Sequence, residues 1–162
     1  MRVYLPLTWA GLAAAAQRGS LPPGPGFAVT PALREWYACG DAEELEFAAM
    51  SDAEEECLRL LAADPSAPRR RVVVAADVPD PDVLLAADRH PAAVLVGAVV
   101  PMRIWASVHV DDPSAAADVT AAAEAITAAD RGDDDARFTV DGAADHPLQW
   151  YAVQEISGLL GE

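Results

Sequence analysis

The most constraining feature of this sequence is an apolar run near its middle, Val72–Ala76, which lies between Arg71 and Asp77 and reads VVVAA. A strand that is exposed on one face alternates between apolar and polar residues, whereas this run is apolar at every position. Such a strand is typical of the middle of a sheet whose two faces are covered by helices. The run therefore predicts a central, doubly buried strand over residues 71–78.

Further strands and helices are predicted around this segment. Apolar patterning predicts strands at residues 2–5, 27–29, 93–99, 104–110 and 138–140. Capping residues and helical spacing predict helices at residues 8–17, 30–40, 41–63, 112–129 and 147–160, the third with a bend or restart at 51–54. These elements predict one α+β domain over residues 1–162, with a mixed sheet of about five or six strands and helices mainly on one face.

The two ends of the chain share an order of predicted elements: strand, helix, Arg-Gly, strand, and a helix that contains the sequence WYA. The WYA triplets are Trp36–Ala38 and Trp150–Ala152. A duplication would give related halves at residues 1–64 and 103–162, joined by central strands within residues 71–99, and a ferredoxin-like fold is one such arrangement. Chance matching of alanine-rich helices explains the similarity equally well.

The charge of the chain excludes one broad class of partner. The 26 Asp and Glu residues outnumber the 11 basic residues, which gives a net charge of −15. Such a chain repels phosphate polymers and anionic lipid headgroups, so we expect no nucleic-acid partner and no membrane surface. The longest apolar stretch, residues 91–102, is shorter than the roughly 20 residues of a membrane-spanning helix. Because the first residues also lack a signal-peptide pattern, we expect a cytoplasmic protein.

Catalytic motifs are absent from the sequence, including GxSxG, HExxH, GxGxxG and the P-loop pattern. The remaining catalytic candidates are polar residues that follow predicted strands, namely Asp77, His109, Asp111 and Asp112. Imidazole and carboxylate groups in such places can act as general bases or bind a divalent cation. The structural alternative is a helix cap, which Asp112 before Pro113 is well suited to form. No metal or cofactor is predicted, and the sequence does not decide whether the chain is an enzyme.

Two other groups of residues are candidates for binding. On the predicted final helix, Trp150 lies opposite the buried stripe and beside Val153. An outward tryptophan indicates contact with another chain or a ligand, and cover by a neighbouring loop is the alternative. Arg69, Arg70 and Arg71 form the only basic cluster, which could hold an anionic metabolite or form salt bridges within the protein.

Several other side chains are expected in the interior. Trp36 and Tyr37 share a predicted helix face with Leu33, so both aromatic rings are predicted to be core. Cys39 and Cys57 lack the spacing of a metal or redox motif and are expected to be reduced thiols.

Five segments together carry a family resemblance: Met1–Pro6, Phe27–Tyr37, Arg70–Pro79, Val108–Asp112 and Trp150–Glu155. In these segments the chain resembles a family of small uncharacterised actinobacterial proteins, a domain of unknown function, over essentially its whole length. The resemblance implies a cytoplasmic protein of actinobacterial origin. It implies no activity, and it supplies no catalytic residues.

Three functional hypotheses follow from these patterns. The leading one is a non-enzymatic binding or protein-interaction module that self-associates or docks a partner through a surface including Trp150. The second is a small metal- or ligand-dependent enzyme that uses the strand-end carboxylates, and it requires those side chains to converge on one pocket. The third is a sensor of an anionic metabolite at the arginine cluster.

Overall fold

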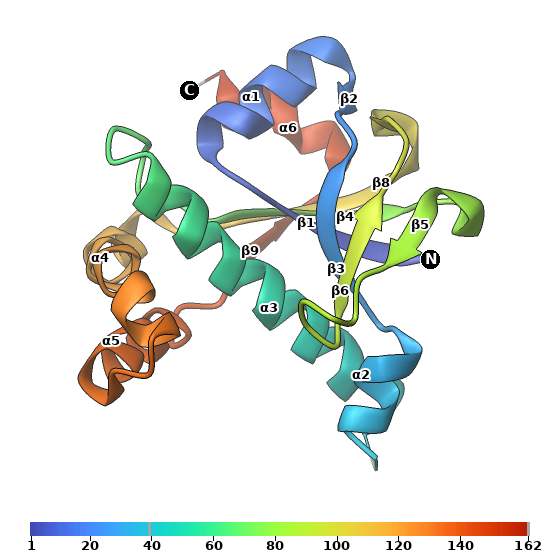
Figure 1. Ribbon diagram of the computed structural model, residues 1–162. Helices are drawn as coiled ribbons and strands as arrows, with labels where there is room; N and C mark the ends of the chain where they lie inside the picture. The colour runs from blue at the N-terminus through green and yellow to red at the C-terminus, as the bar shows by residue number, and fades with distance from the viewer. Residues whose placement is uncertain (39, 162) are drawn as a thin grey trace.

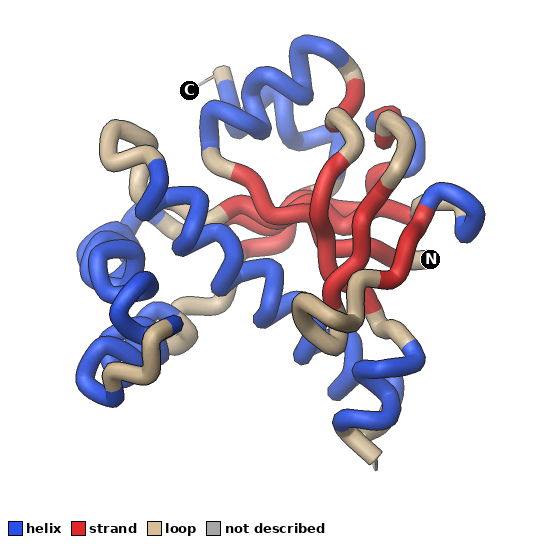
Figure 2. Tube along the Cα trace, viewed as in Figure 1, coloured by secondary structure: helices blue, strands red, loops and turns tan. Residues whose placement is uncertain are grey.

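The computed structural model describes residues 1–38 and 40–161, and its strands lie between two groups of helices (Figures 1 and 2). The helices of eight or more residues are α1 (Trp9–Arg18), α3 (Ala42–Ala63), α4 (Ala116–Asp130) and α5 (Asp134–Ala143). The shorter helices are α2 (Pro31–Trp36) and α6 (Ile156–Leu160). The strands are β1 (Arg2–Leu7), β2 (Ser20–Leu21), β3 (Gly24–Ala28), β4 (Val72–Asp77), β5 (Val83–Leu85), β6 (Ala93–Val96), β7 (Val100–Pro101), β8 (Trp105–Val110) and β9 (Gln149–Tyr151).

The main sheet has seven strands in the order β5-β6-β3-β1-β4-β8-β9, and β2 pairs with β7 in a separate two-stranded sheet. All of these pairings are antiparallel. In β4, Val74 lies between Leu5 of β1 and Val108 of β8, and residues 72–76 are buried. The predicted central strand is therefore confirmed, and so is the α+β class. The sheet contains more strands than expected because β5 and β9 are only three residues long and carry little pattern.

Helices cover both faces of this sheet, whereas the sequence indicated mainly one. On one face, α1 and α6 place Leu12 and Ile156 against the alternate β4 residues Val72 and Val74. On the other face, α3 packs Ala49, Ala53 and Cys57 against Tyr4, Val73 and Ala75. The small α3 residues recur at every fourth position, so the helix lies close to the strands. This arrangement explains why β4 is apolar at every position.

A third cluster of buried residues lies away from the sheet. The C-terminal part of α3 contributes Leu58 and Leu61, which pack against Val119 and Ile126 of α4 and Val140 of α5. Figure 1 shows α4 and α5 side by side next to α3. The long helix α3 therefore joins the sheet to a pair of helices.

The topology contains one half of a ferredoxin-like arrangement. Strands β3 and β4 are both antiparallel to β1, which lies between them, so they are parallel to each other and α2 and α3 form their crossover. This is a split β-α-β unit. In the second part of the chain, β8 and β9 are direct antiparallel neighbours, although α4 and α5 connect them. A second split unit is absent from the described residues.

Two predicted elements near the C-terminus were wrong. Residues 138–140 are helical rather than extended, because the Asp133 carboxylate caps α5 by accepting from the Ala136 N–H at 2.9 Å, and Val140 is buried at helical spacing from Ala143. The segment Trp150–Ala152 begins in strand β9 instead of a long helix, because it pairs with β8. The order of elements that suggested related halves therefore differs between the two ends of the chain.

Among the other local predictions, the two helix caps are confirmed and the helix bend is wrong. Thr8 and Thr30 cap α1 and α2 as predicted, accepting from the third residue that follows each. The predicted bend at 51–54 was wrong, since α3 continues unbroken from the capping box that Asp41 forms with Glu44. Among the described residues, no helix is both long and apolar enough to cross a bilayer.

The interior predictions gave three outcomes. Trp36 and Tyr37 are exposed rather than buried, which corrects the prediction that both are core. Cys57 is a buried free thiol whose pKa burial raises to about 12. The predicted thiol of Cys39 lies outside the described residues.

Candidate functional site

The strand-end carboxylates do not converge on one pocket. Strands β4 and β8 are antiparallel, with Val72 opposite Val110, so Asp111 follows the end of β8 next to the start of β4. Asp77 is at the other end of β4, five residues further along, which corresponds to about 17 Å. There it accepts from Arg2 Nε at 2.7 Å, and this ion pair lowers the pKa of Asp77. The geometry therefore gives no support to an enzyme built on these carboxylates together.

Asp111 and Arg71 form a buried ion pair instead. Arg71 Nε and Nη2 donate to the two carboxylate oxygens of Asp111 at 2.9 and 2.8 Å, and the Arg71 backbone N–H donates to the same carboxylate at 2.8 Å. Arg71 Nη2 also donates to the carbonyl of Ala143, the last residue of α5, and to that of His146, which follows the helix. Glu54 of α3 lies 3.8 Å from Arg71 Nη1, and burial raises the pKa of Glu54 to about 7. These groups tie the sheet to the helices and leave Arg71 no exposed surface for an anion.

The other two arginines of the cluster also bind groups within the chain. Arg69 donates to the carbonyls at the end of α3, including that of Leu61 at 2.9 Å. Arg70 stacks on Trp9, with its guanidinium carbon 4.1 Å from the ring centroid, and donates to the Asp111 carbonyl. The three guanidinium groups therefore do not meet in one anion site.

The remaining predicted residues are distributed around β8 and β9. His109 shares a hydrogen bond of 2.9 Å with Ser107, and burial lowers its pKa, with nearby Arg2 adding to the effect. Trp150 lies opposite His109 in the register and is 62% exposed, as predicted, although on a strand.

Two further predicted residues serve the fold near these strands. Asp112 caps the turn after β8 by accepting from the Ser114 N–H. Val153 packs against the α1 and α6 core, on the sheet face opposite Trp150. Trp150 and Val153 therefore do not form one surface.

An exposed group of aromatic side chains surrounds the start of α3. Trp36 and Tyr37 at the end of α2 are 70% and 47% exposed, and Phe47 on the second turn of α3 is 74% exposed. Helix α2 ends at Trp36 after six residues, so Leu33 is the α2 residue that reaches the core. The rings of Trp36 and Tyr37, which would continue the buried face of a longer α2, lie at the surface instead.

Two of these aromatic residues line a concave surface of about 700 Å³, which we call the aromatic groove. The groove lies along α3 and is lined by Tyr37, Glu43, Glu44, Phe47, Ala48, Ser51 and Asp52. Its floor is mainly apolar, its polar members are mostly carboxylates, and none of its lining residues is basic. It therefore suits a side chain that has an apolar stem and a positively charged end.

A second hollow, the α3 cleft, lies next to the aromatic groove and has a volume of about 390 Å³. Its strand side is formed by residues 25–27 and by Ala93 and Val94, and its helix side by α3 residues from Asp52 to Arg59. Arg89 and His90 from the loop before β6 complete it. Asp52 lines both hollows and is therefore shared between them.

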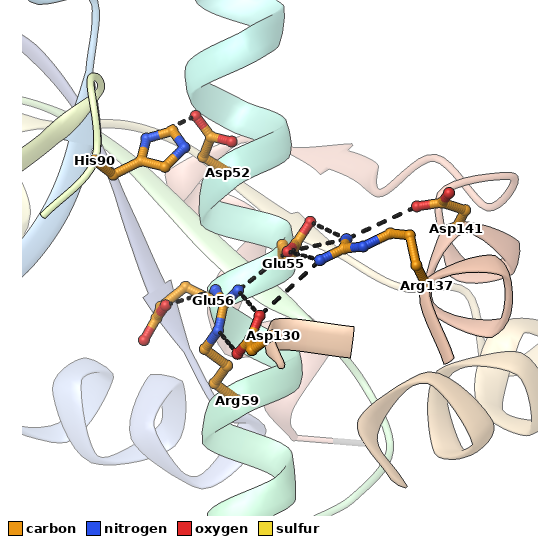
Figure 3. A network of polar contacts seen from close by, with 8 residues as sticks. All are labelled: Asp52, Glu55, Glu56, Arg59, His90, Asp130, Arg137 and Asp141. Carbon is orange, nitrogen blue, oxygen red and sulfur yellow. Dashed lines mark hydrogen bonds and ion pairs between the residues drawn. The ribbon is translucent and has the colours of Figure 1, made fainter. Parts of the chain in front are cut away.

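The Asp52 carboxylate lacks a hydrogen-bond donor among the described residues. The His90 ring points toward it, with Nδ1 3.5 Å from Oδ2 (Figure 3), but His90 Nδ1 already accepts from the Ala92 N–H at 3.2 Å. The Asp52 side chain is only 27% exposed. Burial raises the pKa of Asp52 to about 6, with His90 acting in the opposite direction. The Asp52 carboxylate is therefore largely removed from water, and among the described residues only the His90 ring lies within ion-pair distance of it.

The acidic residues that follow Asp52 on α3 are compensated by arginines (Figure 3). Arg59 binds Glu56 at 3.0 Å and Asp130 of α4 at 2.8 Å. Arg137 of α5 binds Glu55 at 3.2 Å. This network joins α3 to the helical pair, so these charges belong to the fold. In the described part of the chain, neither Glu43 nor Glu44 lies within ion-pair distance of a cation. Arg59 and Arg89 line the α3 cleft with Asp52, but among the same residues neither lies within ion-pair distance of its carboxylate.

The groups that line these two hollows define the chemistry of this region. A serine or cysteine that is hydrogen-bonded to a base is absent from the two hollows among the residues described. Within residues 1–38 and 40–161, no three His, Cys, Asp or Glu side chains are placed to hold a metal ion. What remains is an apolar surface with exposed rings and unpaired carboxylates, which suits a docked side chain.

Comparison with protein families gives a match over nearly the whole chain. The model of a family of unknown function (DUF6912) matches residues 1–160, and so covers every helix and strand described above. Comparisons with curated proteins and with solved structures gave no match.

Proposed function

The chain belongs to this family of unknown function, and from its geometry we propose that it is a non-enzymatic interaction module that docks a segment of another protein in the aromatic groove. The proposed location is the cytoplasm, where the free thiol of Cys57 would stay reduced. An actinobacterial origin remains part of this proposal and agrees with an alanine-rich chain without lysine or asparagine.

The observation that supports the proposal is the exposure of two aromatic rings that line one groove, Tyr37 and Phe47, next to a third exposed ring, Trp36, at the end of α2. Trp36, Tyr37 and Phe47 are 70%, 47% and 74% exposed, although the sheet and helices offer them an apolar interior. Aromatic residues are enriched at protein interfaces, where burying one ring contributes more binding energy than most other side chains. A groove of about 700 Å³ is large enough to receive one or two side chains of a partner.

Charge favours a different protein over a second copy of this chain as the occupant. Glu43, Glu44 and Asp52 line the groove, and none of the described residues that line it is basic. Two copies docked groove to groove would bring these carboxylates together, which is unfavourable. The net charge of −15 adds a long-range repulsion between copies.

The proposal is tested by selecting random peptides on the intact chain and mapping the enriched ones by NMR. We expect enriched peptides to perturb the amide signals of α2 and of the first half of α3. Enrichment of no peptide above an empty-support control would contradict the proposal. Perturbations centred on another surface would contradict it too.

A second candidate surface is the outer edge of β9, through which two copies could pair. β9 is the last strand of the sheet, and its Trp150 is 62% exposed. An open strand edge is a template for pairing with another strand, and an exposed tryptophan would add buried area. If this candidate holds against the net charge, sedimentation velocity gives a dimer that Trp150→Asp converts to monomer, with Phe138→Asp on α5 as the control. A wild-type monomer at high protein concentration would remove this candidate.

A further inference from the structure

We propose that the segment docked in the aromatic groove carries a lysine or arginine side chain whose cationic head pairs with Asp52. This inference rests on the proposed function and specifies the chemistry of the partner. It is drawn from the position of Asp52, the rings beside it and the distribution of charge along α3.

The position of Asp52 makes it a receptor for a cation. Its carboxylate lies where the groove and the α3 cleft meet and accepts no hydrogen bond from the described residues. The His90 ring lies beside it, with Nδ1 3.5 Å from Asp52 Oδ2, and this nitrogen accepts from the Ala92 N–H. A half-buried carboxylate without a donor is unfavourable, and an ammonium or guanidinium group supplies the missing hydrogen bonds.

The rings of the groove suit the stem of the same side chain. Tyr37 and Phe47 line the path to Asp52 and expose part of their rings to solvent. Lysine and arginine have apolar stems that pack on such surfaces while their charged heads reach a polar group. A cation near an aromatic face gains further stabilisation from the ring electrons. An apolar side chain without a charge would use the rings but leave Asp52 without a partner.

The charges along α3 explain why this cation must come from outside. The chain contains no lysine. Arg59 and Arg137 are held by Glu55, Glu56 and Asp130, further along the helix. Glu43 at the rim of the groove adds negative potential without a cation of its own. Arg89 lines the α3 cleft with Asp52, but it lies within ion-pair distance of no α3 carboxylate among the described residues. The arginine ion pairs of α3 therefore lie on its second half, and the carboxylates of its first half are left for a partner.

Two small probes of equal shape test this inference. N-acetyl-arginine methylamide carries the guanidinium group, and N-acetyl-citrulline methylamide replaces it with a neutral urea. In NMR titrations of the intact chain, we expect the arginine probe to give saturable shifts at Phe47 and Asp52. The citrulline probe should bind about fivefold more weakly, since one exposed ion pair contributes up to about 1 kcal/mol.

Matched variants locate the effect. Asp52→Asn should reduce the affinity for the arginine probe to that for citrulline, and Asp145→Asn, an exposed carboxylate after α5, should leave it unchanged. Equal affinities for the two probes, or an unchanged affinity in Asp52→Asn, would overturn the inference. If selected peptides occupy the groove without basic residues, the interaction module stands and the cation pairing fails. If no peptide occupies the groove, the proposed function itself fails.

Discussion

At the scale of single residues, two carboxylates at strand ends contribute differently to stability. Asp111 directly follows β8 and Asp77 is the last residue of β4, but Asp111 is buried against Arg71 and Asp77 is exposed beside Arg2. Removing one partner of a buried pair leaves an uncompensated charge, whereas an exposed pair contributes little. Asp111→Ala is therefore expected to lower the free energy of unfolding by about 3–5 kcal/mol. Asp77→Ala should cost less than about 1 kcal/mol.

Urea unfolding of both variants at pH 7 measures this difference. Equal losses in the two variants would contradict the structural role assigned to the Arg71–Asp111 pair. The arginine can also be tested in the reverse direction, because Arg71→Met would leave Asp111 unpaired and should be as costly as Asp111→Ala.

Glu54 gives the stability a dependence on pH. Its side chain is 19% exposed, and burial raises its pKa from 4.5 to about 7, with Arg71 opposing the shift. A group whose pKa is higher in the folded state stabilises the fold fully below its unfolded pKa and loses this contribution as the pH rises through the folded value. The wild type should therefore lose roughly 3 kcal/mol relative to Glu54→Gln between pH 4.5 and pH 8. Urea unfolding at several pH values measures the difference, and a constant difference would contradict this assignment.

The sequence could locate some functional residues but not their partners. Trp150 faces outward as predicted and no loop covers it among the described residues, although it lies on a strand and not on the predicted helix. Ion pairs such as Arg71–Asp111 join residues 40 positions apart, so no local spacing reveals them. The aromatic groove was missed because Trp36 and Tyr37 continue the helical spacing of Leu33. The one available signal was Asp41 followed by Glu44, a capping box that starts a new helix and limits the length of α2.

At the scale of elements, the packing of β3 against β1 depends on a glycine. A Cβ atom at Gly26 would lie 2.7 Å from Val3 Cγ1 and 3.2 Å from the Tyr4 carbonyl, whereas at Gly24 it would meet nothing within 4 Å. Gly26→Ala is therefore expected to cost about 1–3 kcal/mol of unfolding free energy. Gly24→Ala in the same strand should change it by less than about 0.5 kcal/mol.

Thermal and urea unfolding of the two glycine variants provide the measurement. Because both substitutions add the same methyl group to one strand, a difference between them reports the close approach at Gly26 alone. Equal stabilities would mean that β1 and β3 are less closely packed than described.

Elements with strong local signals were predicted from the sequence, and those fixed by pairing were not. The threonine caps and the apolar run of β4 are local features, and they located the starts of α1 and α2 and the position of β4 correctly. The end of α2 was wrong, because the helix stops at Trp36 and not at residue 40. Strand β9 forms because β8 offers it an edge, which no pattern within residues 149–151 indicates. Helix α5 was missed because its capping Asp133 is the first of three aspartates that also resemble a charged turn.

At the scale of the whole molecule, α3 carries two groups of carboxylates. One group forms ion pairs within the fold, and the other lies at the aromatic groove. Its middle packs on the sheet, its C-terminal half joins α4 and α5 through Arg59 and Arg137, and its first turns project beyond the sheet beside α2 (Figure 1). The projecting end carries the exposed rings and the carboxylates without cations. The same helix therefore supports the fold at one end and presents the aromatic groove at the other.

The central claim is that the aromatic groove binds a partner, and the affinity of a selected peptide for two phenylalanine variants tests it most directly. Phe47 lines the groove, and Phe138 is an equally prominent surface ring on α5, 82% exposed. Calorimetric titration should show that Phe47→Ser weakens binding at least about tenfold, as expected for an aromatic residue at the centre of an interface. Phe138→Ser should leave the affinity unchanged. Equal affinities of the wild type and Phe47→Ser would contradict the account.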